Sequence, residues 1–92
     1  MIKYNQYNLK KLEQIFKESA IQVRYGKGAF QSGYCILESK NIVVVNKYFP
    51  IEGRVNCLID LLTKVNINEE ALSEASAKFL EQVREEMLVE KA

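Results

Sequence analysis

The sequence contains no histidine and a single aspartate, Asp60. Without histidine, Ser-His-Asp and Cys-His catalysis cannot be built, and catalytic zinc sites lose their commonest nitrogen ligand. A carboxylate pair would have to come from glutamates, and the few glutamates of the first 66 residues are scattered along the chain. The composition therefore predicts a protein without catalytic residues, without a metal site and without a cofactor.

Cysteine and long apolar runs are scarce too. Cys35 and Cys57 lie in separate apolar runs without a CxxC spacing, so we expect two buried, reduced thiols rather than a metal or redox site. A disulfide between them would require the two runs to meet. The longest purely apolar run, residues 42–45, is far too short to span a bilayer. The start of the chain lacks the apolar core of a signal peptide, so we expect a cytoplasmic protein with no membrane partner.

The charge is distributed unevenly, although the net charge is only +1. Residues 1–66 contain ten Lys or Arg against five Asp or Glu, whereas residues 67–92 contain three against seven. With 92 residues we expect one domain, residues 1–92, in which a basic body (1–66) carries an acidic C-terminal helix (67–92).

Three strand-like runs follow one another between residues 21 and 47. The first, residues 21–25, alternates apolar and polar positions, as a half-buried strand does. The second covers residues 30–38. The third, residues 42–46, is apolar on both faces, which is typical of a strand covered on both sides.

Turn signals separate these runs and helical patterns surround them. Glycines within residues 26–29 favour a first hairpin, and Asn41, which tolerates a left-handed conformation, favours a second. Apolar residues at helical spacing predict helices at about residues 7–19, from Pro50 to about residue 65, and after Asn68.

The predicted fold class is α+β, with the order α-β-β-β-α-α and an antiparallel meander sheet. We expect a core formed by apolar residues of all these elements. They are Leu12, Phe16, Val23, Ile36, Val44, Leu58, Leu62, Phe79 and Val83.

Two short motifs resemble known sites but lack essential parts. The glycines Gly26, Gly28 and Gly33 precede a strand rather than a helix, so a dinucleotide-binding loop is not expected. Glu38-Ser39-Lys40 forms an E-x-K step like that of restriction-type nucleases, but residues 21–37 hold no Asp or Glu to share a Mg²⁺ ion. A hairpin turn with solvated charges explains each motif better.

Two resemblances to known families rest on longer patterns. The run RYxKGxFxSGYC from Arg24, followed by VVVNKYF from Val43 and by Glu52-x-Arg54, resembles a family of small uncharacterised bacterial proteins, which implies no activity. More distantly, a strand ending in Asn, then Pro50, Arg54 and an amphipathic helix, is similar to HExxH metallopeptidases of the phage-repressor-cleaving type. In those enzymes this helix carries the zinc ligands, and residues 59–63 here contain neither histidine. That resemblance implies a metal-free relic of the scaffold.

One group of residues is a candidate binding site. Basic side chains alternate with aromatic ones around the strands, a combination that contacts phosphates and stacks on bases. We expect two strand ends, a turn and a helix start to bring them to one rim. The candidate residues are Arg24, Lys27, Phe30, Tyr34, Lys47 and Arg54. The opposing interpretation is that the aromatic rings belong to the core and the charges are simply solvated.

The sequence therefore supports three hypotheses. The first is a non-catalytic interaction module that forms a homodimer, because the third strand is apolar on both faces. The second is a small nucleic-acid-binding protein that uses the basic and aromatic rim, with an acidic protein segment as the other anionic partner. The third is an enzyme that uses Glu38 or Asp60.

Overall fold

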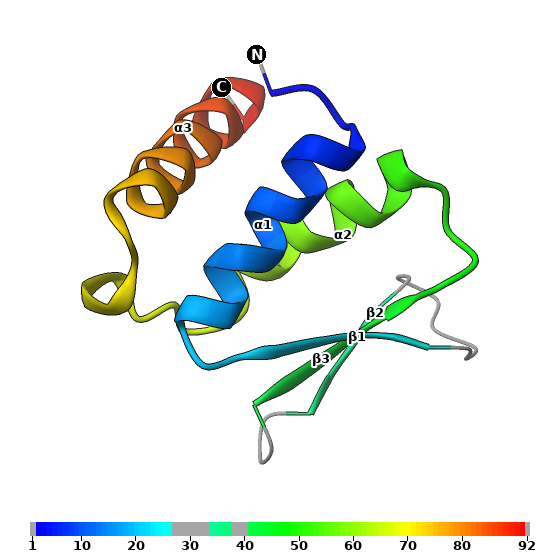
Figure 1. The fold of residues 1–92 in the computed structure, drawn as a ribbon. Helices are drawn as coiled ribbons and strands as arrows, with labels where there is room; N and C mark the ends of the chain where they lie inside the picture. Colours follow the sequence, from blue (N-terminus) through cyan, green and yellow to red (C-terminus); the bar gives the residue numbers. More distant parts are fainter. Residues whose placement is uncertain (1, 27–33, 38–40, 92) are drawn as a thin grey trace.

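A computed structural model describes residues 2–26, 34–37 and 41–91 of the chain, with side chains for residues 2–26 and 41–87. Three α-helices lie on one side of a small sheet, with α1 and α2 nearest to the strands (Figure 1). The elements, in chain order, are α1 (Gln6–Glu18), β1 (Gln22–Gly26), β2 (Tyr34–Leu37), β3 (Ile42–Asn46), α2 (Ile51–Leu62), a 3₁₀ turn η2 (Glu69–Ala71) and α3 (Glu74–Lys91). The predicted mixture of helices and strands is confirmed.

The predicted meander sheet is wrong. The strand order is β1-β3-β2, so β3 lies at the centre and β1 and β2 do not pair. β1 runs parallel to β3, with Val23 beside Val43. Only the β2–β3 pair is antiparallel, with Leu37 beside Ile42. The second predicted hairpin is confirmed, and the left-handed Asn41 at its end has φ 52°.

The length of the connection between β1 and β3 is compatible with this topology. A parallel pair needs a crossover of a dozen or more residues, and residues 27–41, which include β2, separate the two strands. The glycine-containing segment predicted as the first hairpin lies mostly outside the described residues, but β1 and β2 do not form a hairpin pair. The residues of the turn predicted the wrong partner strand for β1, because strand order depends on contacts between residues that are distant in the sequence.

A left-handed residue directs the chain from α1 into β1. Ala20 has φ 62°, and the N–H of Ile21 donates to the Phe16 carbonyl at 2.9 Å while the N–H of Ala20 donates to the Lys17 carbonyl at 3.0 Å. This pair of bonds is the Schellman motif, which usually contains glycine at the left-handed position. Ile21 and Phe16, which the first of these bonds joins, are both buried in the core.

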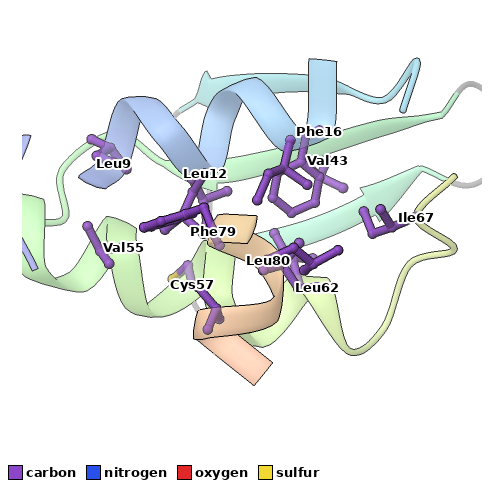
Figure 2. Close-up of a cluster of buried hydrophobic side chains, with 14 of the residues drawn as sticks. Leu9, Leu12, Phe16, Val43, Val55, Cys57, Leu62, Ile67, Phe79 and Leu80 are labelled. Atoms are coloured by element: carbon purple, nitrogen blue, oxygen red, sulfur yellow. The ribbon is translucent and has the colours of Figure 1, made fainter. Parts of the chain in front are cut away.

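The core lies between the helices and one face of the sheet (Figure 2). Helix α1 provides Leu9, Leu12 and Phe16, and β3 provides Val43 from the opposite layer. Of the predicted core residues, six are buried: Leu12, Phe16, Leu58, Leu62, Phe79 and Val83.

The other three predicted core residues have different outcomes. Val23 is half-buried and packs against the core. The side chain of Ile36 lies outside the described residues. Val44 is half-buried, so its prediction as a core residue is wrong. Its neighbours Val43 and Val45 are the fully buried residues of this strand.

The last helix begins later than predicted. Asn68 precedes the 3₁₀ turn, and α3 starts after Ser73, whose hydroxyl accepts a hydrogen bond from the Ser76 N–H at 3.3 Å. Glu18 of α1 accepts the Ser73 N–H at 2.7 Å, and this bond, followed by the one that the Gln14 side chain donates, lowers the pKa of Glu18. A contact between residues 55 positions apart therefore helps to set the start of α3. Within the described part of the chain, no helix is long and apolar enough to cross a membrane.

Candidate functional site

The face of the sheet that points away from the helices is the first candidate site. Residues paired across strands lie on the same face, so Ile42 is grouped with Gln22, and Val44 with Arg24. Ile42 and Val44 are half-buried, while Gln22 and Arg24 are exposed. None of the described elements covers this face in Figure 1. We call these four residues the open face.

Gly26, the last residue of β1, lies next to Val44 of the open face. A Cβ atom built on Gly26 would lie 3.1 Å from Cγ1 of Val44, which is closer than an ordinary van der Waals contact. The absence of a side chain at this position therefore lets the Val44 side chain pack directly against the Gly26 backbone. On the other side of β3, the backbone register pairs Val44 with Cys35 of β2.

The structure brings together only part of the predicted rim. Lys27 and Phe30 lie outside the described residues, and Tyr34 begins β2 with its side chain undescribed. Arg24 belongs to the open face. Lys47 and Arg54 come together at the carboxyl end of β3, because the Arg54 guanidinium donates to the Lys47 carbonyl.

Arg54 holds the connection between β3 and α2 in place. Its Nε donates to the Phe49 carbonyl at 2.9 Å, and its Nη2 donates to the Lys47 carbonyl. The guanidinium carbon lies 5.1 Å from the centre of the Tyr25 ring, within cation–π range. The side chain is half-buried. Arg54 therefore has a structural role in addition to its charge, which the sequence did not indicate.

Tyr25 and Glu13 continue this network into α1. The Tyr25 hydroxyl donates to the Glu13 carboxylate. Burial raises the pKa of Tyr25 well above its usual value, and Glu13 raises it further, whereas the nearby Arg54 opposes the shift. The network links α1, β1, the connection after β3 and α2. Its signal in the sequence was weak, because Glu13 follows the pattern of the solvent-facing positions of α1.

The connection after β3 is the second candidate site. Residues 47–51 contain two of the exposed large hydrophobic residues among the described ones, Tyr48 at 66% exposure and Ile51 at 38%. Lys47 Nζ lies 5.3 Å from the centre of the Tyr48 ring. We call residues 47–51, which end with the first residue of α2, the connector. Its exposed members include Pro50, which precedes α2.

The described residues offer no group of three or more Cys, Asp or Glu that could hold a metal ion. Cys57 is buried in α2, as predicted, and burial followed by the charge of Asp60 raises the pKa of its thiol. The Cys35 side chain lies outside the described residues. Of the two acidic residues proposed for an enzyme, Glu38 is also outside them, and Asp60 is exposed near the end of α2.

Comparison of the chain with protein-family models, with curated proteins and with solved structures finds no match.

Proposed function

We propose that the protein is a small, non-catalytic interaction module whose open face docks onto a second copy of the chain. The observation that supports this most directly is the contrast within β3. Its sequence, Ile42-Val43-Val44-Val45, is the near-continuous apolar run of a strand covered on both faces. The helices of the same chain cover only the face that contains Val43 and Val45.

The parallel pairing of β1 with β3 strengthens the proposal. Sheets built entirely from parallel strands are almost always covered on both faces, whereas antiparallel sheets commonly leave one face in water, and the sheet here contains one pair of each kind. Here the parallel pair has helices on one side alone. A partner on the open face would complete the arrangement that such strands usually have.

A two-fold axis would bring the same face of two copies together, and a face with apolar residues at its centre suits such a contact. Two sheets that pack face to face interdigitate the side chains of their facing surfaces. The central strand contributes the apolar Ile42 and Val44, so apolar groups would meet at the middle of the interface. Arg24 and Gln22 lie on the edge strand β1, where they remain at the rim.

The small size of the face sets the strength of the dimer. Three strands about 4.8 Å apart, two of them five residues long and one four, form a face of roughly 200–300 Å². Stable interfaces bury about 800 Å² on each partner. We therefore expect weak, reversible association that becomes measurable at high protein concentration and changes little with salt.

The nucleic-acid hypothesis has less support from the geometry. Arg54 directs N–H groups to backbone carbonyls of the connector, so among the described rim residues only Arg24 and Lys47 have exposed side chains. Binding through phosphate contacts weakens steeply with salt, so a salt series separates it from apolar docking.

Sedimentation equilibrium over a range of concentrations tests the proposal. Val44→Glu should shift the protein to monomer, because it places a charge at the centre of the apolar interface. Ile51→Glu is the matched control, since it adds the same charge to an exposed apolar residue of the connector. It should leave the association unchanged. Val44→Thr, which keeps the β-branched shape favoured in strands, should weaken association with little loss of secondary structure.

Melting curves of each variant show whether loss of association reflects unfolding. The proposal fails if the wild type remains monomeric at millimolar concentration, or if Ile51→Glu disrupts the dimer while Val44→Glu does not.

A further inference from the structure

The connector presents apolar side chains to solvent from a backbone that is firmly held. The N–H of Tyr48 donates to the Asn46 side chain at 2.9 Å, and the N–H of Phe49 donates to the Asn46 carbonyl at 3.1 Å. Arg54 binds the Lys47 and Phe49 carbonyls from the other side. Residues on both sides of Tyr48 therefore restrain its backbone.

Phe49 anchors the connector to α2. A Cβ atom added to Gly53 would lie 3.0 Å from Cδ2 of Phe49, so the ring packs directly against the glycine in the first turn of the helix. Phe49 is half-buried and contacts the core, whereas its neighbours Tyr48 and Pro50 are exposed. The chain thus buries one aromatic ring to hold the connector and leaves the next ring in solvent.

Preorganised aromatic side chains are the usual anchors of protein interfaces. Less conformational entropy is lost when the backbone that carries a binding side chain is already restrained, and tyrosine is enriched among the residues that dominate binding energy. Tyr48, Pro50 and Ile51 form the apolar part of the exposed connector, and Lys47 places an ammonium group beside the Tyr48 ring. A partner suited to this surface would place an apolar side chain against Tyr48 and a carboxylate beside Lys47.

We infer that the connector is a docking surface for a peptide segment of another protein that carries a large apolar residue next to an acidic one. The open face and the connector are separate surfaces, so this inference does not depend on self-association.

A library of phage-displayed peptides, panned against the immobilised full-length protein, tests this inference. The enriched peptides should contain an aromatic or aliphatic residue beside Asp or Glu. Tyr48→Ala should weaken their binding at least about tenfold, as expected for an interface anchor. Lys47→Glu should weaken the binding of the acidic peptides. Panning against this variant should enrich peptides that contain Lys or Arg instead.

Tyr7→Ala is the matched control. Tyr7 is 68% exposed and lies under Lys11 at 4.7 Å, much as Tyr48 lies under Lys47, but its backbone belongs to α1. This substitution and Val44→Glu should both leave peptide binding unchanged. Arg54→Lys keeps the charge but loses the paired geometry that holds the two carbonyls, so it should weaken binding several-fold.

The melting temperatures of Tyr48→Ala and Arg54→Lys should stay near that of the wild type. Their weaker peptide binding would then come from the lost Tyr48 side chain and from the altered position of the connector, not from unfolding. The inference is overturned if panning enriches no such peptides, if their binding survives Tyr48→Ala, or if Tyr7→Ala weakens it equally. Enriched peptides that bind the open face, detected as sensitivity to Val44→Glu alone, would also contradict it.

Discussion

The two faces of β3 have nearly the same sequence and very different surroundings. Val43 and Val45 point toward the helices and are completely buried, whereas Ile42 and Val44 lie on the open face and are half-buried. Nothing in the four-residue apolar run distinguishes one pair from the other. An apolar strand pattern therefore indicates that both faces are suited to burial, but it does not say whether the same chain provides the cover.

Alanine substitutions on neighbouring positions give the sharpest test of this comparison. Val43→Ala removes two buried carbon atoms from the core and should lower the free energy of unfolding by about 2–3 kcal/mol. Val44→Ala should cost less than about 1 kcal/mol in the monomer, because its side chain is already partly in water. Urea unfolding at low protein concentration measures both values. Equal losses would mean that the open face is covered within the monomer.

Tyr25, on the helix-covered face, should contribute more to the free energy of unfolding than Arg24, on the open face. Tyr25→Phe removes the hydrogen bond to Glu13 and should cost about 1–2 kcal/mol at neutral pH. Arg24→Gln, at an exposed position, should change the free energy of unfolding by less than about 0.5 kcal/mol.

Because the pKa of Tyr25 is raised, the wild type and Tyr25→Phe should differ in how their stability depends on pH. The stabilising effect of the Tyr25 hydroxyl is complete below the ordinary tyrosine pKa of about 10. As the pH rises above that value, the unfolded state loses the proton first and the stability falls. The wild type should therefore lose stability faster than Tyr25→Phe between pH 9 and pH 11, measured by chemical unfolding at each pH. Parallel curves for the two proteins would contradict the buried hydrogen-bonded geometry.

A smaller effect concerns the turn that joins the helical layer to the sheet. Ala20 occupies a left-handed conformation that costs a residue with a side chain about 1–2 kcal/mol. Ala20→Gly should therefore raise the free energy of unfolding by about 1 kcal/mol, since the greater chain entropy of glycine offsets part of the gain. Thermal unfolding measures this increase. A loss of stability would show that the turn differs from the Schellman geometry described above.

Much of the local structure could be predicted from the sequence. Periodicity located the helices and strands, and the preference of Asn41 for a left-handed turn was confirmed. The sheet topology could not be predicted in the same way, because pairing β1 with β3 rather than β2 depends on contacts across residues 27–41. The start of α3 was predicted too early for the same reason, since Glu18 of α1, far away in the sequence, binds Ser73 just before the helix.

The candidate sites were predictable only in part. The apolar character of β3 pointed to the open face, although Val44 was assigned to the core. Basic and aromatic residues suggested a rim, but composition cannot reveal that Arg54 binds two backbone carbonyls. The restrained connector, with Tyr48 exposed beside a half-buried Phe49, is visible only once the backbone hydrogen bonds are known.

Isotope-filtered nuclear Overhauser measurements test most directly the proposal that a second copy covers the open face. A sample that mixes ¹³C-labelled and unlabelled protein at millimolar concentration reports only contacts between copies. The account predicts intermolecular contacts from the methyl groups of Ile42 and Val44, and none from Val43 or Val45, which the helices cover. Intermolecular contacts that come from the connector or the helices instead, or no contacts at all, would contradict it.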